Sequence, residues 1–274
     1  MRSSVLGVLA LSWIAATSGP IGIDLGSVNS VTAAPRRGGV DVLVNEASRR
    51  QTPSIVAFDE RQRLLGQSAS VQLTSSPQSC ASELKSLLCV DRETLQALLP
   101  RLSPTVGVDP ADASEEVWVE LPVHGSPRRF SPTQLVAMLL HKLYRCAEHE
   151  LGAPPTDCAL AVPLRFSAEQ RQAVLDAAQI AGLRGVHLLS DGAAVALDYA
   201  LGRNDLEADA ERHVAFIDAG HSGVQACVAR IRSDSVELLS HASAADVGGA
   251  VRTPCPSTLN HAAHAQPCLR CRQG

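Results

Sequence analysis

The sequence has few aromatic residues and no marked excess of charge of either sign. Aromatic side chains make up only 3% of the 274 residues, so a folded core must be aliphatic. Lysine and arginine total 24 against 28 aspartate and glutamate residues, which gives a net charge of −4. No basic stripe predicts a nucleic-acid surface, and no acidic run predicts a solvating tail. The 45% hydrophobic content is sufficient for a core in one or two domains.

The chain also has no apolar run long enough for a comfortable transmembrane helix, so no membrane span is expected. Its eight cysteines do not have the spacing of a disulfide framework. The apolar run over 5–16 follows Arg2 and precedes small residues, which predicts a signal peptide over residues 1–19. The alternative is a cytosolic chain with an extended start.

The C-terminal segment over 251–274 has a different composition, with three cysteines, two histidines and three prolines and no periodicity. Four of its residues could be written as a zinc site: His261, His264, Cys268 and Cys271. The spacing between the two pairs is far shorter than in the usual zinc fingers. We therefore expect a disordered segment, unrelated to the rest of the chain, that binds no metal.

Between these two ends the chain alternates β-prone and helical patterns. The clearest helix is predicted over 131–151, with Ser131 as its N-cap and Pro132 at its first position. A β-α-β-α series follows, over 157–163, 167–183, 185–189 and 191–202, and it predicts a sheet with helices on its faces.

The remaining segments complete this α/β pattern. Helical periodicity is also present over 67–76 and 80–88, whereas 90–114 gives no clear assignment. Strands are predicted over 21–25, 29–34, 39–45 and 54–58, a hairpin over 117–123 and 126–130, and three strands over 213–220, 223–232 and 235–243.

Two turns with the sequence Asp-x-Gly each lie between β-prone runs, at Asp24–Gly26 and at Asp218–Gly220. A tight Gly-containing turn points backbone N–H groups at one spot and can receive phosphate oxygens. The preceding Asp can hold Mg²⁺ through water. A single Asp-x-Gly more often marks an ordinary turn, but the duplication favours a clamp on a nucleotide's phosphates.

The order of the segments "GIDLGS", "SRRQTPSIVAF", "DCALAVPLRFSAEQRQAVLDAAQIAGL" and "FIDAGHSG" resembles the nucleotide-binding domain of the 70-kDa heat-shock chaperone superfamily. "DAGHSGVQACV" and "VLDAAQIAGL" are more similar to the 110-kDa group, and "NEASRRQTP" to its 170-kDa glucose-regulated branch in the endoplasmic reticulum. The resemblance implies an actin-like, ribonuclease-H-like α/β fold. We expect a first lobe over 20–205 and part of a second lobe over 206–250.

The resemblance also implies roles for individual residues. Lys85 and Asp191 match catalytic positions, and Pro163 matches a residue that relays the nucleotide state. From the residues alone, Lys85 could be a solvated lysine on a helix face, and Pro163 could simply end a strand. The resemblance implies that no protein side chain coordinates a metal directly. Mg²⁺ would instead be held through water near Asp24 and Asp218. The implied phosphate-binding residues are Asp24, Gly26, Ser27, Asp218 and Gly220.

The sequence departs from the family pattern at three positions in or next to these loops. Val28 replaces a hydroxyl residue, His221 interrupts a glycine-rich run, and Gln225 replaces an acidic residue. His221 resembles a loop residue in the 110-kDa group, and we assign it no chemistry. After residue 251 the expected continuation of the second lobe is missing, so we expect a truncated form of the family.

The resemblance thus implies a module that binds ATP or ADP with Mg²⁺ and acts as a nucleotide exchange factor or co-chaperone. Its partners would be a 70-kDa chaperone and unfolded client proteins, in the lumen of the endoplasmic reticulum or alternatively in the cytoplasm. ATP hydrolysis is expected to be weak or absent. An ATP-hydrolysing chaperone, favoured by Lys85 and Asp191, and a non-functional truncated product are the alternatives.

Overall fold

A computed structural model of the chain describes residues 18–36, 38–108, 116–202, 210–245, 247–249 and 270–272. Nearly all of the predicted signal peptide lies outside these residues. So do His261, His264 and Cys268, three of the four residues that could be written as a zinc site. Within the described ranges, no helix is both long and apolar enough to cross a membrane.

The first sheet forms around the first Asp-x-Gly turn, which joins β1 (Ile21–Asp24) to β2 (Asn29–Arg36) as antiparallel neighbours. β1 also pairs in parallel with β11 (Cys158–Val162). The sheet continues as β12-β11-β1-β2-β3, and the short strand β4 pairs with β2. The other strands are β3 (Gly39–Val42), β4 (Thr52–Pro53) and β12 (Val186–Ser190).

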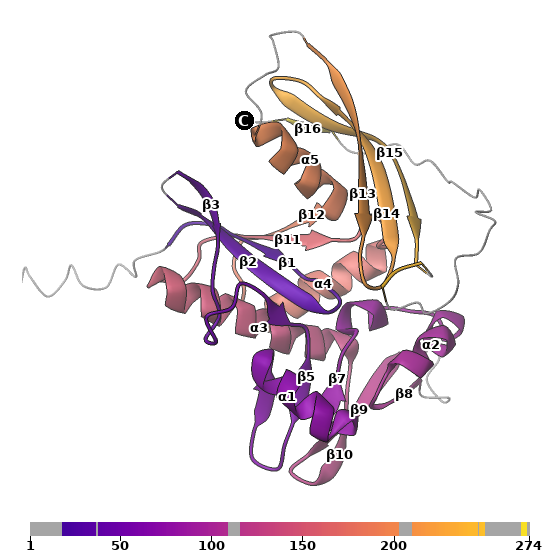
Figure 1. Cartoon of the computed structure of the whole chain (residues 1–274). Helices are drawn as coiled ribbons and strands as arrows, with labels where there is room; N and C mark the ends of the chain where they lie inside the picture. The colour runs from indigo at the N-terminus through magenta and orange to yellow at the C-terminus, as the bar shows by residue number, and fades with distance from the viewer. Residues whose placement is uncertain are drawn as a thin grey trace, which may run out of the picture.

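Two capped helices pack beside this sheet, as Figure 1 shows: α3 (Pro132–Leu151) and α4 (Ala168–Ile180). Each begins at a serine whose side chain accepts a hydrogen bond from the backbone three residues on, with a glutamine completing a capping box. Their apolar faces meet the sheet in a core whose largest fully buried side chains are all Leu or Ile. The aliphatic core predicted from the low aromatic content is therefore confirmed.

Two small three-stranded sheets, β6-β5-β7 and β10-β9-β8, lie beyond α3 in Figure 1. The predicted hairpin is confirmed as β9 (Val117–Val123) and β10 (Ser126–Phe130). The segment without a sequence assignment contains α2 (Arg92–Leu98), η3 (Leu99–Arg101) and β8 (Thr105–Val108). The remaining elements are β5 (Val56–Phe58), β6 (Arg63–Leu65), α1 (Gln67–Ser75) and η1 (Pro77–Ser79).

The helix predicted over 80–88 is wrong. Cys80–Ala81 forms β7 and pairs with β5, and only Leu84–Leu87 turns helically, as the 3₁₀ element η2. Between them Glu83 has a φ of 55°, in the left-handed region that no α-helix tolerates. Tertiary pairing with β5 therefore overrides the local periodicity.

The second sheet is antiparallel, in the order β13-β14-β15-β16. Its strands are β13 (Arg212–Ala219), β14 (Val224–Ile231), β15 (Ser235–Ala244) and β16 (Arg270–Arg272). Helix α5 (Asp191–Leu201) lies between the two sheets in Figure 1 and packs its buried Ala196 with residues of β14 and β15. Tyr199 of α5 meets Phe216 of β13 edge-on, with ring centroids 5.5 Å apart.

Strand β16 comes from the segment that we expected to be disordered. Its residues Arg270–Arg272 pair antiparallel with Ser235–Glu237 of β15, so for these three residues the structure differs from that expectation. The physical reason is that an edge strand presents unpaired backbone groups and accepts another strand wherever one can reach it.

Candidate functional site

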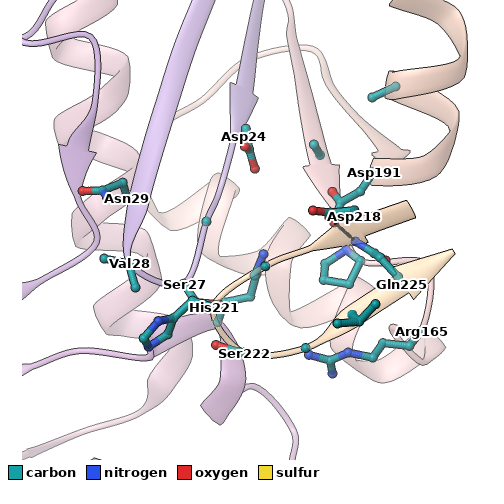
Figure 2. Close-up of a pocket in the computed structure, with 18 of the residues that line it drawn as sticks. Asp24, Ser27, Val28, Asn29, Arg165, Asp191, Asp218, His221, Ser222 and Gln225 are labelled. Carbon is teal, nitrogen blue, oxygen red and sulfur yellow. Dashed lines mark hydrogen bonds between the residues drawn. The ribbon is translucent and has the colours of Figure 1, made fainter. Parts of the chain in front are cut away.

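A cleft of about 480 Å³ lies between the two sheets and contains every site residue predicted from the sequence. Figure 2 shows Asp24 at the end of β1, Asp191 at the start of α5 and Asp218 near the end of β13. The structure thus brings together residues separated by almost two hundred positions in the chain. The predicted residues in the lining are Asp24, Gly26, Ser27, Lys85, Pro163, Asp191, Asp218 and Gly220.

The first loop is held in a tight form that only glycine allows at position 26. A Cβ on Gly26 would lie 2.0 Å from the carbonyl oxygen of Asn29. The hydroxyl of Ser54 donates to the Gly26 carbonyl at 2.7 Å, and the Ser54 backbone N–H donates to the carbonyl of Val28 at 2.8 Å. Because both ends of the turn are fastened to Ser54, the loop is positioned before any ligand binds.

The second loop is equally constrained. The backbone N–H of Gly220 donates to the carbonyl of Gly223 at 2.9 Å, and that of Gly249 donates to the carbonyl of Gly220 at 3.1 Å. Gly248 packs so closely that its Cβ would lie 2.6 Å from the carbonyl oxygen of His221. Gly248 and Gly249, which follow β15, therefore pack against the turn and support it.

Gln225 occupies the centre of the acidic side of the cleft. Its amide nitrogen donates to Oδ2 of Asp191 at 2.9 Å and to Oδ2 of Asp218 at 3.0 Å, drawn as dashed lines in Figure 2. Its amide oxygen accepts from the backbone N–H of Leu164 at 3.2 Å. Where an acidic residue would add a third negative charge, this amide instead links two carboxylates.

Two cations balance the carboxylates. Lys85 enters the cleft from η2, and Arg165, which the sequence reasoning missed, enters from just beyond Pro163 at the end of β11. Desolvation lowers the pKa of Lys85, while the charges of Asp191 and Asp24 oppose that shift. Burial likewise lowers the pKa of Arg165, and Asp191 opposes it.

Asp24 has the opposite shift. Its pKa is raised, chiefly because the carboxylate is desolvated, and the nearby charge of Lys85 acts against this rise. Asp191 and Asp218 raise the pKa of Asp24 further because like charges disfavour ionisation. Its ionised form would therefore be stabilised by any cation that enters the cleft.

Glu83, at the edge of the cleft, is a second residue that the sequence reasoning missed. It is buried and accepts a hydrogen bond from Ser222 at 2.8 Å, and Nε2 of His221 lies 2.8 Å from its other carboxylate oxygen. No motif marks it; the only available signal is its place two residues before Lys85.

The first sheet has parallel strands at its centre and helices beside it, and it is joined to a second, antiparallel sheet. The two Asp-x-Gly turns face one cleft between these sheets. Together these features define an actin-like ATP-binding domain. Residues 20–251 match the protein family described as Hsp70 protein, and the chain belongs to the Hsp70 family. Both the resemblance and the fold class predicted from the sequence are therefore confirmed.

Curated relatives agree with this assignment. The chain is 38% identical to heat shock 70 kDa protein 16 of Arabidopsis thaliana over 234 residues, which are 84% of this chain and 30% of the relative. It is 35% identical to heat shock 70 kDa protein 15 of the same plant over 84% of this chain and 27% of the relative. It is 34% identical to heat shock protein hsp88 of Neurospora crassa over 84% of this chain and 32% of the relative. The chain thus spans less than a third of the length of each of these relatives.

Proposed function

We propose that this chain binds ATP or ADP with Mg²⁺ in the cleft and serves as the nucleotide-binding module of a nucleotide exchange factor or co-chaperone. The observation that carries the proposal is the meeting of two preformed Asp-x-Gly loops across one cleft that also contains Lys85 and Arg165. Backbone N–H groups of the loops would bind phosphate oxygens, and the two cations would balance their charge.

The residues fit a magnesium ion held through water. Among the described residues, no group of three or more His, Cys, Asp or Glu side chains could itself hold a metal ion. Asp24 and Asp218 both line the cleft, and a hydrated ion could contact their carboxylates without direct ligation. When bound near Asp24 and Asp218, Mg²⁺ would neutralise part of the charge of the phosphates.

We propose exchange activity rather than fast ATP hydrolysis because of Gln225. Its amide already donates hydrogen bonds to Asp191 and Asp218, so these carboxylates are less available to orient an attacking water. The alternative, an ATP-hydrolysing chaperone, is favoured by Lys85, whose ammonium lies in the same cleft. Phosphate release measured for the wild type and for Lys85→Ala distinguishes the two. Mg²⁺-dependent turnover that is lost in the variant would support the enzyme.

Nucleotide binding is tested by calorimetry with ADP and ATP, each with Mg²⁺ and with a chelator. Asp191→Asn should weaken binding of nucleotide with Mg²⁺, because it removes a negative charge that attracts the hydrated cation and changes the partner of Gln225. The matched control is Asp198→Asn, an exposed residue of the same helix outside the cleft lining. Equal effects of the two substitutions, or no binding by the wild type, would contradict the proposal.

The partner proposal is a 70-kDa chaperone together with unfolded client proteins. Release of fluorescent ADP from such a chaperone should accelerate when this chain is added, and aggregation of a heat-denatured client should slow. A chain that neither binds nucleotide nor accelerates release would instead match the third alternative, a product without activity of its own.

For location we propose the lumen of the endoplasmic reticulum, with the cytoplasm as the alternative. The proposal depends on Arg2, the apolar run over 5–16 and the small residues that follow it. Mass spectrometry of the mature N-terminus should find cleavage between about residues 16 and 20. An intact Met1 on a cytoplasmic protein would contradict it.

A further inference from the structure

Glu83 is a buried carboxylate in an unusual backbone conformation. Only 5% of the residue is exposed, and its φ of 55° places a non-glycine residue in the left-handed region. Such conformations cost free energy and persist where the surrounding contacts determine them. Glu83 also immediately precedes η2, the element that carries Lys85 into the cleft.

The partners of Glu83 come from two different parts of the fold. Two partners come from the same part of the chain as Glu83: Arg101 donates to Oε1 at 3.2 Å, and the hydroxyl of Ser86 donates to Oε2 at 3.3 Å. From the second phosphate loop, 139 positions away in sequence, Ser222 donates to Oε2 at 2.8 Å. Nε2 of His221 lies 2.8 Å from Oε1. Each carboxylate oxygen therefore has one partner from each side.

These contacts use the two polar side chains of the second loop. Figure 2 shows His221 and Ser222 on the side of the cleft near Ser27, with their side chains directed away from Asp191 and Asp218. Because both side chains bond to Glu83, neither fills the space where an anion in the cleft would meet the backbone of the loop.

We propose that Glu83 is a positioning residue that fastens the second phosphate loop to the first lobe and so sets the separation of the two loops before the ligand binds. This inference rests on the proposed nucleotide binding and deepens it. A clamp that is already assembled loses less conformational freedom on binding, and its affinity rises for that reason.

The proposal makes a prediction whose sign is opposite to that of simple electrostatics. Removing a negative charge beside a site for phosphates should strengthen anion binding if the charge acts only through its field. If Glu83 positions the loop, its neutralisation should weaken binding instead. Glu83→Gln keeps the shape of the side chain but places an amide NH2 group where one carboxylate oxygen now meets two partners.

The first measurement is hydrogen exchange of the ligand-free protein. In Glu83→Gln, amides of the loop over 220–223 should exchange about tenfold faster, the effect of losing one charge-assisted hydrogen bond, while those of α3 stay unchanged. Glu120→Gln is the matched control, because Glu120 pairs with Arg129 outside the cleft lining. Unchanged loop exchange in Glu83→Gln would overturn the proposal.

The second measurement is the affinity for ADP with Mg²⁺ by calorimetry, where Glu83→Gln should bind about tenfold more weakly. Tighter binding would show a purely electrostatic role and overturn the proposal. If even the wild type binds no nucleotide, the proposed function fails, while the hydrogen-exchange result still decides whether Glu83 holds the loop. If Glu83→Gln does not fold, Ser222→Ala removes the contact from the loop side, and the same exchange result is expected.

Discussion

The side-chain amide of Gln225, on β14, donates a hydrogen bond of 2.9 Å to Asp191, the first residue of α5. The same nitrogen donates to Asp218 at 3.0 Å, and the amide oxygen accepts from the backbone of Leu164. One side chain thereby connects the end of β11, the start of α5 and β13. Gln225 thus joins the two sheets at the cleft.

Replacing Gln225 with Leu should destabilise the protein. The substitution removes the donor shared by two carboxylates and leaves them close together without it, so we expect a loss of about 1–3 kcal/mol in the free energy of unfolding. Urea denaturation followed by circular dichroism measures this loss. Gln172→Ala is the control, because Gln172 makes a similar bond to Asp176 on the exposed face of α4. If both variants lose the same stability, the bridge has no special structural role.

Gly26→Ala should distort the first phosphate loop. The added Cβ would approach the Asn29 carbonyl oxygen to 2.0 Å, so the backbone must shift, and we expect a cost of about 1–3 kcal/mol with a loss of nucleotide affinity. Gly22→Ala in the adjacent strand is the matched control, because its Cβ would meet no atom within 4 Å. Thermal unfolding and calorimetry of the two variants compare them directly. An equally mild effect at both positions would show that the tight turn is not required.

Cys158 should resist alkylation in the folded protein. Burial raises the pKa of its thiol from 9.0 to about 12, and the thiolate is the reactive form. At pH 8 the thiolate fraction should therefore be about a thousandfold lower than in the unfolded chain. Mass spectrometry after brief treatment with iodoacetamide should find the exposed Cys89 modified and Cys158 intact. Early modification of Cys158 would show that β11 opens readily.

The raised pKa of Cys158 also makes the stability of the folded protein depend on pH. Because the folded pKa is raised, the contribution of Cys158 is complete below pH 9.0 and is lost as the pH rises towards about 12. Cys158→Ala should therefore flatten the decline in stability over this range, as measured by urea denaturation at several pH values.

Much of the fold could be predicted from local sequence because its signals are local. Ser131 and Ser167 with their glutamines mark the starts of α3 and α4, and each Asp-x-Gly turn is a short pattern that can be seen in the sequence itself. The helix predicted over 80–88 failed because strand pairing with β5 decides that segment. The role of Glu83 could not be predicted because its partner Ser222 is 139 positions away and no short pattern records that contact.

In the part of the chain that the structure describes, β13 lies at one edge of the second sheet. Within the described residues β13 pairs only with β14, and Ile217 on β13 is 76% exposed, opposite Ala226. An edge strand with an exposed apolar side chain promotes association between chains. Ile217→Lys should therefore reduce self-association, because a charged edge disfavours strand pairing. Analytical ultracentrifugation over a concentration series measures the change.

The matched control for this edge is Val71→Lys, which changes a similarly exposed apolar residue on α1, a helix whose backbone groups are already bonded internally. It should leave the association unchanged. If Val71→Lys reduces association as much as Ile217→Lys, the added charge acts through general solubility. If neither variant changes it, the chains associate through another surface, and the edge of β13 is not the site of contact.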